Sequence, residues 1–271
     1  MTGPLRVAAA QAESVSGDVE ANVATAVSLV DSAARNGARL VVLPELFLTG
    51  YDPDRWGPDA AVTPEDPLLQ PLRDAARDRA VVVVAGAAVR RAADRHTLSL
   101  LVLDADGGLT APYDKQHLFQ AERGFFTPGD HGATIRLDGW AIGLGICYDG
   151  CFPEHATAAA SDGATAYLCP SAYYVGSEHR RDLYYAARAL DNGIYVVYSG
   201  LAGKCGSYAF NGGSAVYGPE GRPVDRVGDE VPAIAYADLD PAEVARVREM
   251  NPIGRDRVAG LGKRHHHELT G

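Results

Sequence analysis

The chain has 271 residues, of which 46% are hydrophobic and 22% charged, and its formal net charge is −10. This composition is typical of a soluble globular protein with one large core, and no stretch of 18 apolar residues predicts a membrane-spanning helix. The acidic balance argues against general nucleic-acid binding, which needs clustered lysines and arginines.

The N-terminal half begins with an apolar run that predicts a strand over residues 6–11, followed by the clearest helical pattern, over residues 18–36. Gly37 follows this helix, where a left-handed residue often ends one. Further strands are predicted at residues 39–44, 80–87 and 97–104, and residues 104–108 suit a hairpin link. The apolar stripe of the helix consists of Val19, Val23, Val27, Val30 and Ala34.

The C-terminal half continues the same alternation. Strands are predicted at residues 140–147, 164–170 and 194–200, a helix between Ser177 and Gly193, and a short helix opened by Asp240 as its cap. Residues 218–221 suit a second hairpin link. The alternation predicts a layered α/β domain, although periodicity alone does not separate a sandwich from a doubly wound sheet.

The N-terminus, MTGPLRVAAAQ, lacks the pattern of a secretory signal, so a cytoplasmic location is expected. The four cysteines are therefore expected to be free thiols. No CxxC pair or nearby histidine completes a zinc set, so no structural metal is expected. Cys169 is interpreted as a core residue and Cys205, in the GKCGS loop, as an exposed thiol; the other two are Cys147 and Cys151.

Two polar residues stand out beside the predicted strands. Glu45, in LVVLPELFLTGY, follows a strand that ends at Pro44, and such strand ends are where ligands usually meet side chains. Its alternative role is a solvated turn carboxylate. Lys115, in APYDKQHLF, follows a Pro–Tyr–Asp turn, where a lysine is ordinarily a surface residue.

Cys147, in WAIGLGICYDGCFPE, ends a strand that contains Gly143 and Gly145, which permit close approach of the backbone. A thiol at a strand-to-helix bend faces exposed N–H groups, which together with a nearby ammonium lower its pKa and stabilise an oxyanion. The alternative is a small buried core thiol.

The three motifs together, with gaps of 70 residues (45 to 115) and 32 residues (115 to 147), resemble the nitrilase superfamily of carbon–nitrogen hydrolases. That family carries a Glu–Lys–Cys triad in such contexts: PELFLTGY, a lysine before HLF, and a CYD…FPE turn. The resemblance runs from residues 6–11 to about Asp238 and includes ERGFFTPGD and RALDNGIYVV.

The resemblance implies a role for each matching residue. Cys147 matches the nucleophile, Glu45 the general base and Lys115 the residue that stabilises the tetrahedral intermediate, while Glu122 matches a second glutamate that orients the lysine. It implies neither a metal nor a cofactor. Tyr51, Tyr148 and Tyr173 are expected at the substrate pocket, where Tyr174 could form a wall together with Tyr173.

The expected reaction is hydrolysis of a small amide to a carboxylic acid and ammonia through a cysteine thioester. Nitrile and N-carbamoyl hydrolysis on the same triad stay open, as do a catalytically silent scaffold and a redox sensor using Cys147 and Cys151. The segment His179–Arg181 could meet a substrate carboxylate, or be a solvated helix start.

The family fold implied by the resemblance is an α-β-β-α sandwich that pairs into a larger sandwich on dimerisation. We therefore expect one domain over residues 1–271, a homodimer formed through residues 154–161 and 178–192, and a flexible tail over residues 256–271. The sequence assigns no role to the histidine run 265–267 in that tail.

Overall fold

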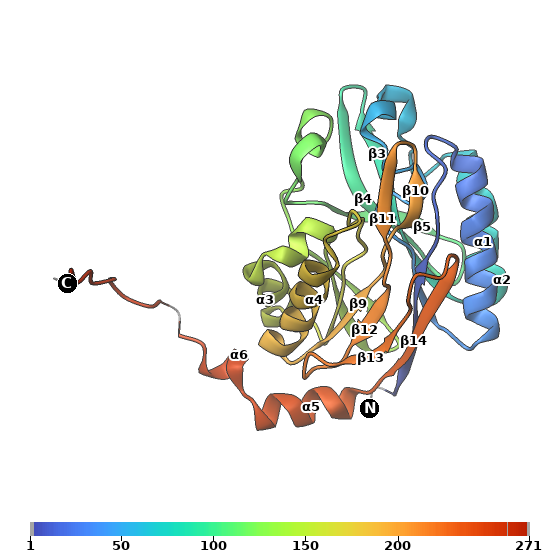
Figure 1. Cartoon of the computed structure of the whole chain (residues 1–271). Coiled ribbons are helices and arrows are strands. Elements are labelled where there is room, and N and C mark those ends of the chain that lie inside the picture. Colours follow the sequence, from blue (N-terminus) through green and yellow to red (C-terminus); the bar gives the residue numbers. More distant parts are fainter. Residues whose placement is uncertain (1–2, 259, 270–271) are drawn as a thin grey trace.

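The computed structural model of the protein describes residues 3–258 and 260–269, and over these residues two six-stranded sheets lie face to face between two pairs of helices (Figure 1). The first sheet has the strand order β14-β1-β2-β3-β4-β5 and the second β13-β12-β9-β8-β7-β6. The strands of the first sheet are β1 (Leu5–Gln11), β2 (Leu40–Val42), β3 (Val82–Ala92), β4 (Arg95–Leu103), β5 (Leu109–Asp114) and β14 (Ala233–Leu239). Those of the second are β6 (Ala133–Leu137), β7 (Trp140–Leu144), β8 (Ala166–Leu168), β9 (Tyr195–Tyr198), β12 (Ala215–Tyr217) and β13 (Pro223–Arg226).

The two sheets repeat one pairing pattern. β1, β2 and β3 are parallel neighbours, as are β7, β8 and β9, and antiparallel strands flank each trio. A small separate hairpin, β10 (Ala202–Cys205) with β11 (Tyr208–Asn211), rises beside the sheets. The sandwich expected from the resemblance is therefore confirmed.

Helices cover the outer face of each sheet. α1 (Val19–Arg35) and α2 (Gln70–Arg79) flank the first sheet, and α3 (Pro153–Ser161) and α4 (Glu178–Asn192) flank the second (Figure 1). α5 (Pro241–Met250) and α6 (Ile253–Asp256) follow the last strand. Short 3₁₀ turns link these elements: η1 (Pro53–Arg55), η2 (Pro58–Ala60), η3 (Pro67–Leu69), η4 (Gln120–Gly124) and η5 (Cys147–Cys151).

Local sequence explains α1 well. The side chain of Asp18 caps it by accepting from the N–H of Ala21 at 3.0 Å, and Gly37 lies just beyond its end at φ +82°. Its buried face holds Val23 and Val30, as the apolar stripe predicts. The predicted helix over residues 18–36 is confirmed.

The main core lies between the sheets, where the central strands are buried on both faces, as expected. Several strand boundaries were wrong. The strand predicted over residues 80–87 runs on to Ala92, and the one predicted over residues 140–147 ends at Leu144, so Cys147 lies in the η5 turn rather than in the ladder. Gly143 does permit close approach, because a Cβ there would lie 2.6 Å from that of Ala159.

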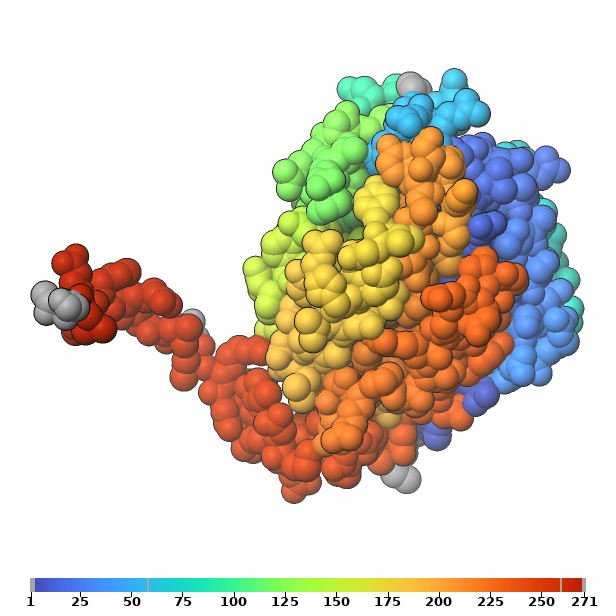
Figure 2. Space-filling model, in the orientation of Figure 1, coloured from blue at the N-terminus to red at the C-terminus, as the bar shows by residue number. Residues whose placement is uncertain are grey.

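The described residues after α6 are exposed and form neither helix nor strand, and in Figure 2 they extend away from the body of the molecule. The predicted tail over residues 256–271 includes positions 259, 270 and 271, which lie outside the described residues. Its flexibility stays a prediction. Within the described part of the chain, every helix is too short or too polar to span a bilayer.

Candidate active site

The turn that carries Glu45 is fixed against strand β3. The N–H of Gly86 donates to the carbonyl of Pro44 at 3.1 Å, and the carbonyl of Gly86 accepts from the N–H of Leu48, also at 3.1 Å. A Cβ at position 86 would lie 2.5 Å from the N of Leu46 and 2.7 Å from the Cα of Glu45. Only glycine therefore lets the glutamate turn lie this close to the sheet.

Lys115 follows β5 directly and is completely buried. The residues before it are strand rather than the expected turn, and the alternative of an ordinary surface lysine is wrong. Its Nζ donates to Oε1 of Glu45 at 2.6 Å and to Oε1 of Glu122 at 2.8 Å. Burial opposes the charge of Lys115, but the two carboxylates outweigh it and raise the pKa of this ammonium well above its usual value.

Glu122 lies in η4 and is held on both oxygens. Its Oε1 accepts from the hydroxyl of Tyr51 at 2.6 Å as well as from Lys115, and its Oε2 accepts from the N–H of Phe119 at 2.7 Å. The structure thus brings Glu122 to the lysine, as expected, while Tyr51, which was expected at the substrate pocket, lines the cavity and also holds Glu122.

Cys147 begins the η5 turn with φ +46°, a left-handed conformation that is costly for a residue with a Cβ. Its N–H donates to the carbonyl of Pro170 at 2.9 Å. No backbone carbonyl of the described residues accepts from the next N–H, that of Tyr148. That donor is therefore available to a bound oxyanion.

Glu45 faces the thiol. Burial raises the pKa of Glu45 to about 7, against the lowering effects of Lys115 and of a hydrogen bond from Cys147. Oε2 of Glu45 has no hydrogen-bond partner among the described residues. This oxygen is therefore free to take a proton.

The resting thiol keeps its proton. Burial and the charge of Glu45 raise the pKa of Cys147 well above its ordinary value, and Lys115 only partly offsets them. The expected lowering of this pKa is therefore wrong for the empty site. Proton removal by a neighbouring base is needed before the sulfur becomes a nucleophile.

A cavity of about 180 Å³ lies beside Cys147, and Glu122 and Cys151 also line it. Arg180 is the other charged side chain of its described lining, and no described carboxylate pairs with that guanidinium. The sequence analysis missed two of the aromatic lining residues, Phe119 and Tyr184, although Tyr184 is one helical turn beyond Arg180. The aromatic lining consists of Tyr51, Phe119, Tyr148, Tyr173, Tyr174 and Tyr184.

Other candidate residues lie elsewhere. Arg181 is buried and donates to the side chain of Asn211 at 2.9 Å and to the carbonyl of Gly212 at 2.8 Å, so its proposed contact with a substrate carboxylate is wrong. Cys205 is buried in β10 rather than exposed, whereas Cys169 is a core residue as expected.

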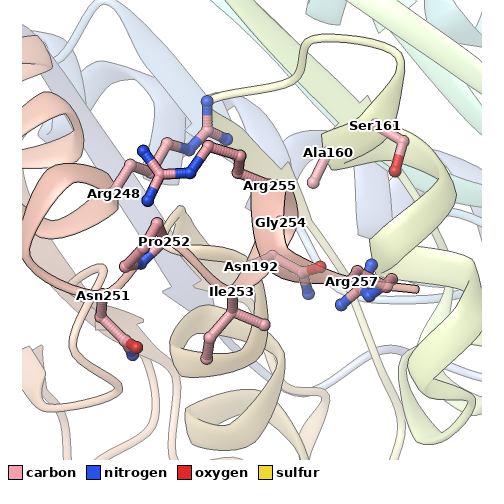
Figure 3. A pocket seen from close by; sticks show the side chains of 10 residues that line it. All are labelled: Ala160, Ser161, Asn192, Arg248, Asn251, Pro252, Ile253, Gly254, Arg255 and Arg257. Carbon is pink, nitrogen blue, oxygen red and sulfur yellow. The ribbon is translucent and has the colours of Figure 1, made fainter.

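Cavity size alone does not identify the site. A larger cleft of about 320 Å³ lies where the ends of α3 and α4 meet α5 and α6 (Figure 3). Its described lining includes Arg248, Arg255 and Arg257 but no thiol and no carboxylate. Among the described residues, no group of three or more histidine, cysteine or acidic side chains is placed to hold a metal ion.

Residues 6–249 match the carbon-nitrogen hydrolase family. Human "Omega-amidase NIT2" is 31% identical over 252 residues, covering 89% of this chain and 90% of that protein. A "Nitrilase" from Pyrococcus abyssi is 32% identical over 242 residues, covering 87% of this chain and 90% of that protein.

Solved structures of an amidase from Nesterenkonia sp. AN1 have the same fold. One carries the acetamide moiety of fluoroacetamide added covalently at its active-site cysteine, with 28% identity, a TM-score of 0.83 and 95% coverage of both chains. A double mutant in complex with acrylamide also has 28% identity and a TM-score of 0.83, covering 94% of this chain and 95% of that chain.

Proposed function

The chain belongs to the carbon–nitrogen hydrolase family, and from this we propose that it hydrolyses a small amide to a carboxylic acid and ammonia through a thioester on Cys147. The arrangement of Glu45 and Lys115 against the Cys147 thiol, beside a small cavity, carries the proposal. Relatives named omega-amidase and amidase support an amide substrate. Membership of an enzyme family removes the reason to favour a silent scaffold.

In the first half-reaction, Glu45 takes the thiol proton as the sulfur of Cys147 attacks the amide carbon. The ammonium of Lys115 and the N–H of Tyr148 stabilise the negative oxygen that forms. Glu45 then gives the proton to the amide nitrogen and the C–N bond breaks. Ammonia departs, and the acyl group remains on Cys147 as a thioester.

In the second half-reaction, water attacks the thioester after giving a proton to Glu45, and the carboxylic acid leaves as the thiol is restored. Glu122 and Tyr51 act by holding the Lys115 ammonium, because each hydrogen-bonds within the same cluster. The overall reaction consumes one water and one amide and needs no electron donor or acceptor.

The substrate is proposed to be a short amide with an anionic group at its far end. The cavity of about 180 Å³ equals roughly six waters at about 30 Å³ each, enough for a chain of four or five carbons. Arg180 supplies an unpaired positive charge on its lining. A monoamide of a dicarboxylic acid fits both features. An N-carbamoyl amino acid shares the carboxylate and is the alternative.

The test of the reaction is ammonia release from succinamic acid, glutaramic acid, butyramide, N-carbamoyl-β-alanine and butyronitrile. We expect turnover of the amides and its abolition in Cys147→Ala, with the buried cysteine variant Cys205→Ala as the matched control. Intact mass of a slowed Glu45→Gln variant should show the acyl adduct. Turnover that survives in Cys147→Ala would contradict the mechanism.

The test of the substrate is Arg180→Gln. Loss of a charge-assisted hydrogen bond should raise KM for succinamic acid by about 10-fold, with kcat/KM for butyramide unchanged. His179→Ala, which changes the exposed neighbouring residue, is the control. Equal effects on the anionic and the neutral amide would exclude Arg180 as the anion-binding group.

We also propose a single catalytic domain in a cytoplasmic homodimer whose shared face includes α3 and α4. The family match over residues 6–249 supports one domain. On α4, Leu183 and Leu190 are 68% and 44% exposed, which supports a contact on that helix.

A further inference from the structure

Asp149 is a fully buried carboxylate two residues after Cys147, and the reaction above gives it no task. Its Oδ2 accepts from the N–H of Ile146 at 3.0 Å and from the hydroxyl of Tyr113 at 2.7 Å. One oxygen of Asp149 therefore joins the turn before the nucleophile to the strand before the lysine.

The other oxygen, Oδ1, contacts the chain beyond the lysine. It accepts from the backbone N–H of His117 at 2.9 Å, and Nδ1 of the same ring lies 2.9 Å away. Asp149 thus holds residues two before and two after Lys115, and also the residue directly before Cys147. Among the described residues, these contacts make Asp149 a direct bridge between the two halves of the site.

A second layer holds this bridge. The hydroxyl of Tyr113 also meets Nε2 of His155 at 2.8 Å, and Nδ1 of His155 meets the hydroxyl of Tyr167 at 2.9 Å. One neutral tautomer satisfies all these contacts, with Tyr113 donating to Asp149, His155 Nε2 donating to Tyr113, and Tyr167 donating to His155 Nδ1. Burial lowers the pKa of His155, which agrees with a neutral ring.

The bridge bears on the strained nucleophile turn. Cys147 has φ +46°, a left-handed conformation that is unfavourable for a residue with a Cβ. The bond from the N–H of Ile146 to Oδ2 of Asp149 fixes the peptide between Gly145 and Ile146, and the backbone N–H of Asp149 donates to the carbonyl of Ile146, in the peptide before Cys147, at 2.9 Å. Both bonds restrict the backbone that leads into the thiol and the N–H of Tyr148.

We propose that Asp149 is a positioning residue that holds Cys147 and the Tyr148 N–H in register with Lys115 during attack on the substrate. The inference rests on the proposed cysteine mechanism. A displacement of about 1 Å in such a site costs on the order of 100-fold in rate. Because Asp149 does not line the cavity, its loss should leave substrate binding intact.

The experiment compares Asp149→Asn with Asp130→Asn, an exposed carboxylate paired only with its neighbour His131. Asparagine keeps the shape of the Asp149 side chain but replaces one carboxylate oxygen by an NH₂ group. This NH₂ group donates, and it would face the donors that the oxygen had accepted from. We expect kcat to fall about 100-fold in Asp149→Asn with KM unchanged, and no change in Asp130→Asn.

Alkylation separates positioning from general damage to the fold. Fluoroacetamide reports folded, reactive sites, because the sulfur of Cys147 bonds to its methylene carbon as fluoride leaves, and this displacement needs no stabilised oxyanion. We expect the alkylation rate of Cys147 in Asp149→Asn to fall by less than about fivefold, well short of the loss in kcat, since the bridge sets the register of the thiol with Lys115 and the Tyr148 N–H, which alkylation does not use.

Two results would overturn the inference. One is a kcat of Asp149→Asn within twofold of that of the parent protein. The other is a fall in kcat that is matched by an equal fall in the fraction of Cys147 that fluoroacetamide can alkylate. Tyr113→Phe keeps the core shape and removes one bond to Oδ2, so it decides the question if Asp149→Asn does not fold. It should lower kcat about 10-fold at unchanged KM, and an unchanged kcat would overturn the inference. Failure of Cys147→Ala to abolish turnover would instead reject the proposed function.

Discussion

At the residue scale, the charge balance of the site is set by burial. Glu45 and Lys115 are both fully buried, and Glu122 is 1% exposed, so two carboxylates share one ammonium with little solvent around them. Charge in such a place is stable only when paired. Burial and the pairing of Lys115 with both carboxylates together place the pKa of Glu45 at about 7, so that Glu45 can both accept and donate a proton at neutral pH.

This balance predicts the pH dependence of the enzyme. The pKa of Glu45 is raised to about 7, so its basic form grows as pH rises through 7 and is lost below it. We expect kcat/KM to fall about tenfold per pH unit below that pKa. The measurement is kcat/KM as a function of pH, which reports the ionisation of the free enzyme, with succinamic acid and with butyramide as substrates.

Two variants check the assignment. Glu45→Gln should remove the acid limb and lower kcat about 100-fold or more, while Glu20→Gln, at an exposed position in α1, should leave the profile unchanged. A profile that stays flat down to pH 5 would show that Glu45 is not the base.

The identities of the site residues could be predicted from the sequence, but their pKa shifts could not. The resemblance to the nitrilase superfamily identified Glu45, Lys115, Cys147 and Glu122, and the structure brings all four together. The pKa direction of Cys147 could not be predicted, because it depends on how much solvent the fold removes. Asp149 was also missed, since a carboxylate in a turn gives no sign of four converging hydrogen-bond donors.

At the element scale, strand β3 supports the glutamate turn through Gly86. Gly86→Ala should press a methyl group into the backbone of residues 44–46 and displace Glu45. We expect a lower Tm, a loss of about 1–3 kcal/mol in the free energy of unfolding from overpacking, and a fall in kcat.

Gly132→Ala is the matched control, because a Cβ there meets no atom within 4 Å and its φ is not left-handed. Thermal unfolding and kcat should be measured on both variants. Parent-like stability and activity in Gly86→Ala would mean that the turn moves without cost.

The long apolar strands and α1 were predictable because each buries a regular pattern of side chains. α2 was missed because only Leu72, Ala75 and Ala76 are buried among charged and polar neighbours. Strands such as β10 to β13 have three or four residues, too few to show a period. The strand over residues 140–147 was predicted too long, because the sequence of an extended segment is the same whether or not it pairs with a neighbouring strand.

At the scale of the whole molecule, the exposed leucines of α4 predict an oligomer. Leu183 and Leu190 are seven residues apart and share one face of the helix. Leu183→Glu should convert a dimer into a monomer in sedimentation velocity, whereas Val224→Glu, at an exposed position on β13, should not. A parent protein that is monomeric at micromolar concentration would refute the proposed pairing.

The division of the site between the two sheets has a further consequence. Glu45, Lys115 and Glu122 all precede the exposed residues 130–132, Cys147 follows them, and β14 returns from the later half to pair with β1. A chain cut in that loop would give two fragments, neither with a complete set of reacting groups. Ammonia release after mixing them would then measure fragment complementation, so catalysis itself would report that the halves had rejoined.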